Sequence, residues 1–302
     1  ANTPIYIIWD MGASSQKVLA SGFTDNNGSF SGSFRVPEAP YGSHTVTGID
    51  NDAHADTENF FVYPKLYAWP GSGVVGDSFY VVGYGYSANV SVDVYWDYSQ
   101  YIGSSTTDVN GTFVGVFVIP YTPVGTHIIY AEDANNVNTT TTYSVNPNIV
   151  IHPDHGLSGI SVDANCTGFS ANTGIKIYWD YGTPNQQLLD TGTTDGTGSY
   201  NTTVTIPSAG NGSHSIVAID DNNYIAQTTF YLGPTILLNP DYGPVGTNVT
   251  ITGMTFASNA NVDIYWDGTY IKSATTNSTG DFSTYIIAVS YTHLTLPTTE
   301  RV

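Results

Sequence analysis

VDIYWD at residues 262–267 is the stretch that decides the fold, because close variants of it recur along the chain. The variants are IYIIWD at 5–10, VDVYWD at 92–97 and IKIYWD at 175–180. Their tryptophans, Trp9, Trp96, Trp179 and Trp266, are 87, 83 and 87 residues apart. Self-similarity at a fixed interval is typical of a repeat protein. The chain is therefore read as four copies of one unit of about 85 residues.

Other residues recur at fixed distances from each tryptophan. In the third repeat, Pro153 and Gly156 precede Trp179 by 26 and 23 residues. A Thr-Asx-x-x-Gly turn follows the tryptophan, and then a proline, His214 and Asp220. The segment between the tryptophan and that turn is long in repeats 1 and 3 and short in repeats 2 and 4. Trp9 to Trp179 and Trp96 to Trp266 are both 170 residues, which indicates a super-repeat of two units.

Each repeat reads as seven short strands. In the third repeat these are NIVIHP, ISVDANCTGF, IKIYWD, QLLDTGTT, SYNTTVTIP, HSIVAID and AQTTFYL. Alternation with Thr, Val, Ile and Tyr favours strands, and Gly, Asn, Asp and Pro clusters favour turns between them. Seven strands in this length predict an all-β fold of tandem immunoglobulin-like β-sandwiches. Prolines at every junction between repeats predict a rod-like array, because proline stiffens an extended strand.

Strand parity separates the residues of the opening motif. Alternate side chains face opposite sides of a strand, so Trp266 shares a face with Val262 and Ile264. We expect all four tryptophans to be core residues. Tyr265 and its equivalents Tyr95 and Tyr178 face outward, where they either pair across strands or form a contact surface for another chain or for sugar rings.

Composition excludes several classes of partner. The chain carries 25 Asp and Glu against six Lys and Arg, for a formal net charge of −19. Such a charge argues against nucleic acid, which is bound by clustered cations, and against an anionic membrane surface. No apolar run approaches the length of a membrane span. The acidic, Thr-, Ser- and Asn-rich composition indicates an extracellular or cell-surface location.

A single cysteine, Cys166, excludes an internal disulfide. It occupies the position of Gly83 and Gly253 in the neighbouring repeats, which predicts a small buried residue. Nine Asn-x-Ser/Thr sequons make a glycoprotein an expectation. They are at Asn27, Asn89, Asn110, Asn138, Asn165, Asn201, Asn211, Asn248 and Asn277.

NPDYGPVGTNVTITGMTF at 239–256, followed by VDIYWDG, resembles the opening of an IPT/TIG-type immunoglobulin-like domain. All four units are similar to the tandem Ig-like repeats of bacterial and archaeal surface proteins. The resemblance implies a stalk, an adhesive tip, a surface-layer or filament subunit, or a spacer beside a catalytic domain. It carries no catalytic residue over to this chain.

The constant spacings of the recurring residues predict where each unit begins and ends. Residues 1–64 read as a partial repeat that lacks its first two strands, 65–147 and 148–234 as complete repeats, and 235–288 as a partial repeat that lacks its last two. The last segment, VSYTHLTLPTTERV at 289–302, lacks the recurring residues at the expected spacings. It is similar to translated sequencing-adapter sequence, and we expect it to be a non-native tail on a metagenomic fragment.

The acidic turn between the last two strands of each repeat raises the question of calcium. Oxygen-rich loops can bind Ca²⁺, and the candidate ligands are Asp50, Asp52, Asp133, Asp220 and Asp221. Asp is also an ordinary turn residue, so both interpretations stay open. His152 and His155 resemble a metal pair, but no ligand recurs at their positions in the other repeats.

No spacing typical of a nucleotide loop, a zinc site or a catalytic triad is found. We therefore expect a non-enzymatic extracellular structural protein: a segment of a surface stalk, an adhesin or a filament subunit. Its expected partners are copies of itself or cell-surface glycans, with no cofactor except Ca²⁺. The alternatives are a calcium-dependent glycan-binding adhesin module and the spacer domains of an extracellular hydrolase.

Overall fold

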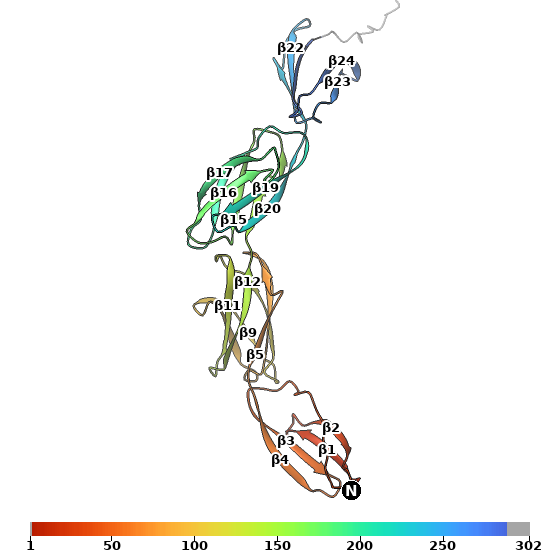
Figure 1. Cartoon of the computed structure of the whole chain (residues 1–302), viewed down its shortest axis with the longest axis vertical. Helices are drawn as coiled ribbons and strands as arrows, with labels where there is room; N and C mark the ends of the chain where they lie inside the picture. The colour runs from red at the N-terminus through yellow and green to blue at the C-terminus, as the bar shows by residue number, and fades with distance from the viewer. Residues whose placement is uncertain (1, 289–302) are drawn as a thin grey trace, which may run out of the picture. The chain divides into compact units, whose positions relative to one another are not determined.

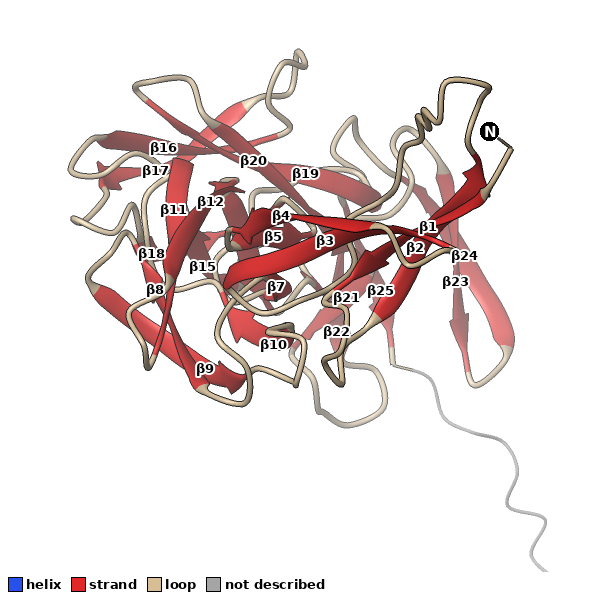
Figure 2. Ribbon diagram, turned by 90° about the horizontal axis from the view of Figure 1, so that it is seen from below, coloured by secondary structure: helices blue, strands red, loops and turns tan. Residues whose placement is uncertain are grey.

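The computed structural model describes residues 2–288, and every regular element in that range is a β-strand (Figures 1 and 2). With no helix there, the described chain has no helix able to cross a membrane. The chain divides into two compact units, Ala1–Asn146 and Pro147–Val302. Each unit contains two of the repeats, and each is described by itself below.

The third repeat is a complete sandwich of two sheets. A three-stranded sheet has the order β13 (Asn148–His152), β15 (Ser161–Thr167), β18 (Tyr200–Thr205). A five-stranded sheet has the order β14 (His155–Gly156), β20 (Ile225–Leu232), β19 (Gly212–Asp220), β16 (Gly174–Trp179), β17 (Gln187–Thr193). All pairings are antiparallel except that of β14 with β20. The predicted immunoglobulin-like all-β fold is confirmed.

The second repeat has the same topology. Its three-stranded sheet has the order β10 (Phe113–Val118), β7 (Ser78–Tyr84), β5 (Lys65–Trp69). Its five-stranded sheet has the order β6 (Ser72–Gly73), β12 (Asn138–Val145), β11 (Gly125–Asp133), β8 (Ser91–Trp96), β9 (Gln100–Thr106). The fourth strand pairs with the third, β9 with β8 and β17 with β16, across a bulge in each case.

The first strand of each complete repeat is split in two, which the sequence did not reveal. Pro70 and Pro153 each lie between the two parts, β5 and β6 or β13 and β14. Proline has no N–H for a sheet ladder. The chain therefore leaves the three-stranded sheet at the proline and adds a short parallel strand to the five-stranded sheet.

The two outer repeats are partial within the described residues. Repeat 1 is a four-stranded sheet of β2 (Lys17–Phe23), β1 (Pro4–Trp9), β3 (Gly42–Asp50) and β4 (Ala55–Val62). Repeat 4 has β21 (Thr235–Asn239), β22 (Asn248–Met254) and β25 (Phe282–Ile287) in one sheet, and β23 (Asn261–Trp266) and β24 (Thr269–Thr275) in another. The tail expected at 289–302 lies outside the described residues.

One segment of repeat 1 shows how much a strand depends on its partner. Residues 29–41 carry the sequence pattern of a fifth strand but form no strand. In the other three repeats that strand pairs with the second one: β10 with β7, β18 with β15 and β25 with β22. No described residue of repeat 1 supplies the second strand, so the backbone of 29–41 has no ladder to join.

Each complete repeat buries its own core between its sheets. In repeat 2 the largest buried side chains include Phe79, Trp96 and Tyr143; in repeat 3 they include Trp179 and Phe230. One cross-strand pair differs between the repeats. Gly83 faces Phe113 and Gly253 faces Phe282, whereas Cys166 faces the half-buried Tyr200. A side chain at the glycine position thus occurs where the residue opposite is not a buried phenylalanine.

Candidate functional site

The invariant Trp-Asp pair meets the recurring histidine in every repeat that contains one. In repeat 3, Trp179 is fully buried, and the ring of His214 stacks on it with centroids 4.5 Å apart and planes 20° apart. The strands β16 and β19 place the two rings side by side, because Trp179 pairs with Ile216 in the ladder. We call Trp179, Asp180 and His214, and their equivalents, the Trp–Asp–His cluster.

Hydrogen bonds engage both nitrogens of the histidine ring. His214 Nδ1 lies 2.8 Å from Asp180 Oδ2, and Nε2 lies 2.7 Å from the carbonyl oxygen of Gly210. The second carboxylate oxygen of Asp180 accepts the Ser215 N–H at 3.0 Å. An Asp–His pair can activate a nucleophile only when the second ring nitrogen is free. Here it is bound to backbone, so the cluster ties three segments of the fold together.

The same geometry is present in the other two clusters. His44 Nδ1 lies 2.7 Å from Asp10 Oδ2 and stacks on Trp9 at 4.9 Å, while His127 Nδ1 lies 2.7 Å from Asp97 Oδ2 and stacks on Trp96 at 5.1 Å. Trp9 and Trp96 are buried, and Trp266 of the partial repeat 4 is half-buried against its smaller core. Each of these histidines also bonds a backbone carbonyl, of Pro40 or Pro123, through Nε2.

The aspartate of the cluster sits at a special backbone position. Asp10, Asp97, Asp180 and Asp267 all have φ between 45° and 47°, the left-handed region that Asp tolerates better than most residues. The sequence predicts a turn residue there, but not its bond to the histidine. For Asp10, burial raises the pKa, and the hydrogen bonds from His44 and Thr45 outweigh it, so that the pKa lies below its ordinary value.

Two of the aspartates offered as calcium ligands, Asp133 and Asp220, accept backbone N–H groups. Asp220 Oδ1 accepts from Asn222 and Tyr224 at 3.0 and 2.9 Å, and Oδ2 accepts from Ser170 at 3.0 Å. Asp133 does the same with Asn135, Val137 and Ser87. Both residues are buried. Their carboxylates hold the turn between the last two strands and join it to the loop after the second strand.

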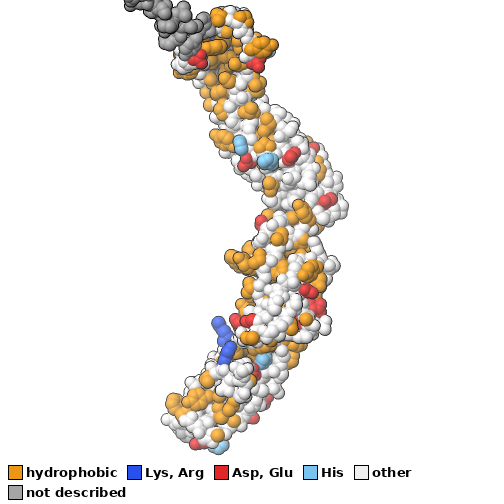
Figure 3. Space-filling view, turned by 180° about the vertical axis from the view of Figure 1, so that it is seen from behind, with side chains coloured by type: hydrophobic (Ala, Val, Ile, Leu, Met, Phe, Trp, Pro, Cys, Tyr) orange, Lys and Arg blue, Asp and Glu red, His pale blue; other side chains and the backbone are white. Residues whose placement is uncertain are grey.

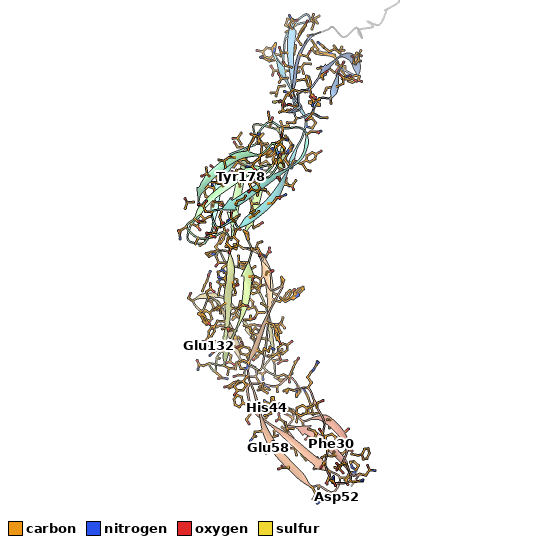
Figure 4. The ribbon with its side chains drawn as sticks, viewed as in Figure 1. Phe30, His44, Asp52, Glu58, Glu132 and Tyr178 are labelled. Carbon is orange, nitrogen blue, oxygen red and sulfur yellow. The ribbon has the colours of Figure 1, made fainter. Side chains whose placement is uncertain are left out.

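The remaining calcium candidates, Asp50, Asp52 and Asp221, are less buried. Asp50 lies at the equivalent turn of repeat 1 and accepts the N–H groups of Asp52 and His54 at 2.9 Å. Asp50, Asp52 and His54 bring three ligand atoms within 4.8 Å of one another at the far end of repeat 1 from His44 (Figure 4). Asp50 Oδ2 bonds His54 Nδ1 at 2.9 Å, and this bond raises the pKa of His54 and lowers that of Asp50. Asp221 is exposed and lies 4.0 Å from Lys176 Nζ. Calcium binding stays a prediction of the sequence.

The outward tyrosines of the third strand are flanked by other aromatic rings. Tyr95 meets Tyr101 edge-on at 5.7 Å, Tyr178 (Figure 4) lies 5.2 Å from Tyr181, and Tyr265 lies 6.0 Å from Tyr270. Tyr95 and Tyr178 are half-buried, whereas Tyr265 is 59% exposed. Tyr95 and Tyr265 pair with tyrosines of the next strand, whereas Tyr181 follows Tyr178 in the same chain segment. The role of these tyrosines in contacts stays a prediction.

The sequon asparagines and Cys166 are the remaining residues singled out from the sequence. Eight of the nine sequon asparagines are exposed and Asn110 is half-buried, so the backbone and side chains leave room for glycans at most of them. Cys166 is buried, and burial raises the pKa of its thiol to about 12. A thiol with so high a pKa is a poor nucleophile.

The outer side of the three-stranded sheet of repeat 2 was not singled out from the sequence. Six large apolar side chains stand on it, each between 46% and 70% exposed: Tyr67, Trp69, Tyr80, Val114, Val116 and Val118. We call these six residues the apolar face. A signal was present in FVGVFV at 113–118, which has no polar residue on either parity, whereas YNTTVT at the same place in repeat 3 does.

Comparison with known proteins identifies no family. No protein-family model matches the chain, and no curated protein matches it. Among solved structures, the tetra-tandem repeat in the extending region of a large adhesion protein is 15% identical, with 96% of this chain and 84% of that chain covered, at a TM-score of 0.29. The adhesin InvE of Yersinia pseudotuberculosis is 15% identical, with 65% and 63% covered, at 0.28.

A third similar structure is the SGBP-B protein of the Bacteroides ovatus mixed-linkage glucan utilization locus, in complex with a mixed-linkage heptasaccharide. It is 13% identical, with 96% of this chain and 85% of that chain covered, at a TM-score of 0.28. Likenesses of this size carry no argument about function.

Proposed function

We propose that this chain is a non-enzymatic, extracellular structural protein, a segment of a surface stalk, adhesin or filament, whose repeats project or associate with one another. The observation that carries the proposal is the Trp–Asp–His cluster. The polar side chains that recur in every histidine-containing repeat bond to their own repeat at 2.7–3.0 Å. The recurring residues thus make contacts that stabilise their own sandwich.

The strand arrangement supports a mechanical role. In repeat 3, β14 near the start of the repeat pairs in parallel with β20 at its end, with His155 opposite Tyr231 and Gly156 opposite Leu232. The pairing of β6 with β12 is the same in repeat 2. Pulling the two ends of such a repeat loads these parallel bonds in shear, so several must break together before the repeat opens.

Force spectroscopy on the full chain tests this role. We expect separate unfolding events for the two complete repeats, each releasing about 85 residues, or roughly 300 Å of extended chain at about 3.5 Å per residue. A Trp179→Ala substitution should lower the force of one event and leave the other unchanged. Unfolding of the complete repeats without measurable resistance would contradict a mechanical role.

A further inference from the structure

The apolar face of repeat 2 differs from the same side of the same sheet in repeat 3. Its ladder rows run across three strands: Trp69 opposite Tyr80 and Tyr80 opposite Val116 in one, and Tyr67 opposite Val82 and Val82 opposite Val114 in the next. Trp69 is 70% exposed and Val116 59%. A contiguous apolar patch of this kind on a folded protein marks a contact surface.

Repeat 3 provides an internal comparison, because it has the same sheet with the same register. His152 stands where Trp69 does, Asp163 where Tyr80 does, and Thr203 where Val116 does. Thr203 Oγ1 donates to Asp163 Oδ1 at 3.0 Å. The fold therefore does not require apolar residues at these positions, and the apolar character of repeat 2 needs a cause outside its own core.

Charge restricts what can cover the face. The chain has 25 acidic residues and six basic ones, and on the side of the molecule in Figure 3 acidic side chains are scattered while Lys and Arg gather at one place. Two copies of such a chain repel each other over most of their surface. The strands that form the face, 65–69, 78–84 and 113–118, contain no Asp or Glu. Lys65, at one end, lies over the ring of Tyr67 at 5.0 Å.

The arrangement of large and small side chains is self-complementary. The aromatic residues Trp69 and Tyr67 are on the edge strand β5, the valines are on the opposite edge strand β10, and Tyr80 is on β7 between them. A two-fold axis parallel to β7 places the β10 of one copy over the β5 of the other. Val116 of one copy then faces Trp69 of the second, which suits the interdigitated packing of two sheet faces.

We propose that the apolar face is the contact through which two copies of this chain associate face to face. The inference rests on the proposed structural function and names the surface that performs self-association. Three strands about 4.8 Å apart and about 20 Å long give a face of a few hundred Å² per copy, below the roughly 800 Å² per partner of a stable complex. The association is therefore weak in solution and gains strength where many copies are held side by side.

Sedimentation equilibrium of the full chain, from about 10 μM to about 1 mM, tests the proposal. The weight-average mass should rise with concentration, and more steeply at high salt, because salt screens the repulsion between like charges. The variant Trp69→His/Tyr80→Asp/Val116→Thr takes its residues from repeat 3, which tolerates them. It should weaken association by roughly tenfold or more, since aromatic residues at the centre of an interface carry most of its energy.

Two further variants complete the design. Tyr101→Asp/Tyr121→Asp changes exposed aromatic residues of repeat 2 outside the face and should leave the association unchanged. His152→Trp/Asp163→Tyr/Thr203→Val, added to the triple variant of repeat 2, should restore it by moving the face to repeat 3. The proposal would be overturned if the wild-type chain stayed monomeric at both low and high salt. It would also be overturned if the triple variant associated as strongly as the wild type.

A different occupant would also be visible. Electrophoresis in a gel containing a neutral β-glucan should retard the wild type and the triple variant equally. Retardation of a monomeric wild type alone would assign the face to a polysaccharide and overturn the inference. Either failure leaves the force measurement on the same chain unaffected, so loss of this contact is distinguishable from loss of the proposed structural function.

Discussion

At the scale of single residues, the Trp–Asp–His cluster explains why three dispersed residue types recur. The tryptophan is predictable from strand parity, and the aspartate from its turn-forming tendency. Their connection through the histidine is not, because Trp179 and His214 are 35 positions apart and meet only when β16 pairs with β19. The histidine bonds the aspartate and stacks on the tryptophan, so its loss removes one contact from each of them.

Replacement of the cluster histidine should destabilise its repeat. In His214→Ala, Asp180 loses its partner, Trp179 loses its stacked ring and the Gly210 carbonyl loses a donor, which together cost about 2–4 kcal/mol. Hydrogen exchange of β16 and β19 in the full chain should accelerate accordingly. His155→Ala is the control, since that side chain is 76% exposed; equal acceleration in both variants would contradict a role for the cluster.

Asp10 gives the cluster a pH dependence with a definite sign. Its pKa lies below the ordinary value, because the hydrogen bonds from His44 and Thr45 outweigh the effect of burial. Folding therefore gains stability from the charged carboxylate above the unfolded pKa of about 3.9, and loses it as the pH falls through the lower folded pKa. Carbon NMR of the Asp10 carboxyl group should give a titration midpoint below about 3.9. The His44→Ala substitution should raise that midpoint. A midpoint unchanged by that substitution would contradict the assignment.

At the scale of elements, the turn before the fifth strand makes the same close contact in repeats 2, 3 and 4. Gly111, Gly198 and Gly280 have φ of 71°, 72° and 80°, and their N–H groups bond Asp108, Asp195 and Asn277. A Cβ at any of them would collide with a backbone carbonyl, of Tyr86, Phe169 or Phe256 respectively. The left-handed glycine was predictable from Asx-x-x-Gly, whereas the carbonyl that it contacts comes from a loop 24–29 residues earlier.

Gly198→Ala should therefore be strongly destabilising. The substitution adds a collision with the Phe169 carbonyl to the strain of a left-handed alanine of about 1–2 kcal/mol, and we expect a loss above about 3 kcal/mol. Gly196→Ala, two residues earlier, meets no atom within 4 Å and should change stability by less than about 1 kcal/mol. Urea unfolding of repeat 3, monitored by hydrogen exchange of the β18 amides, measures the loss of stability in each of these two variants.

At the scale of the whole molecule, the rod-like array expected from the proline junctions stays a prediction. A compact domain of this length would have a radius of gyration of about 19 Å. Small-angle X-ray scattering of the monomeric triple variant of the apolar face should give a value well above that. A measured radius near the compact value would show that the repeats fold back on one another.

The sequence by itself determined the repeat, the strand order within it and the inward parity of its tryptophans, because hydrophobic alternation and turn residues are local properties of the chain. The same locality explains where it failed. Residues 29–41 alternate like a strand but form none, because the partner strand is absent from the described part of repeat 1. A strand is stable only in its ladder, and a pattern cannot say whether the ladder exists.

Only the tertiary structure decided which recurring residues act together and which apolar side chains share one surface. The histidine, the aspartate and the tryptophan converge through strand pairing. Two of the aspartates offered for calcium, Asp133 and Asp220, accept N–H groups from loops up to 50 residues away. The apolar face can be recognised only when the register of its three strands is known, because Trp69, Tyr80 and Val116 are distant in the chain and adjacent on the sheet. Contacts between distant residues depend on register, and register is set by the packing of the whole sandwich.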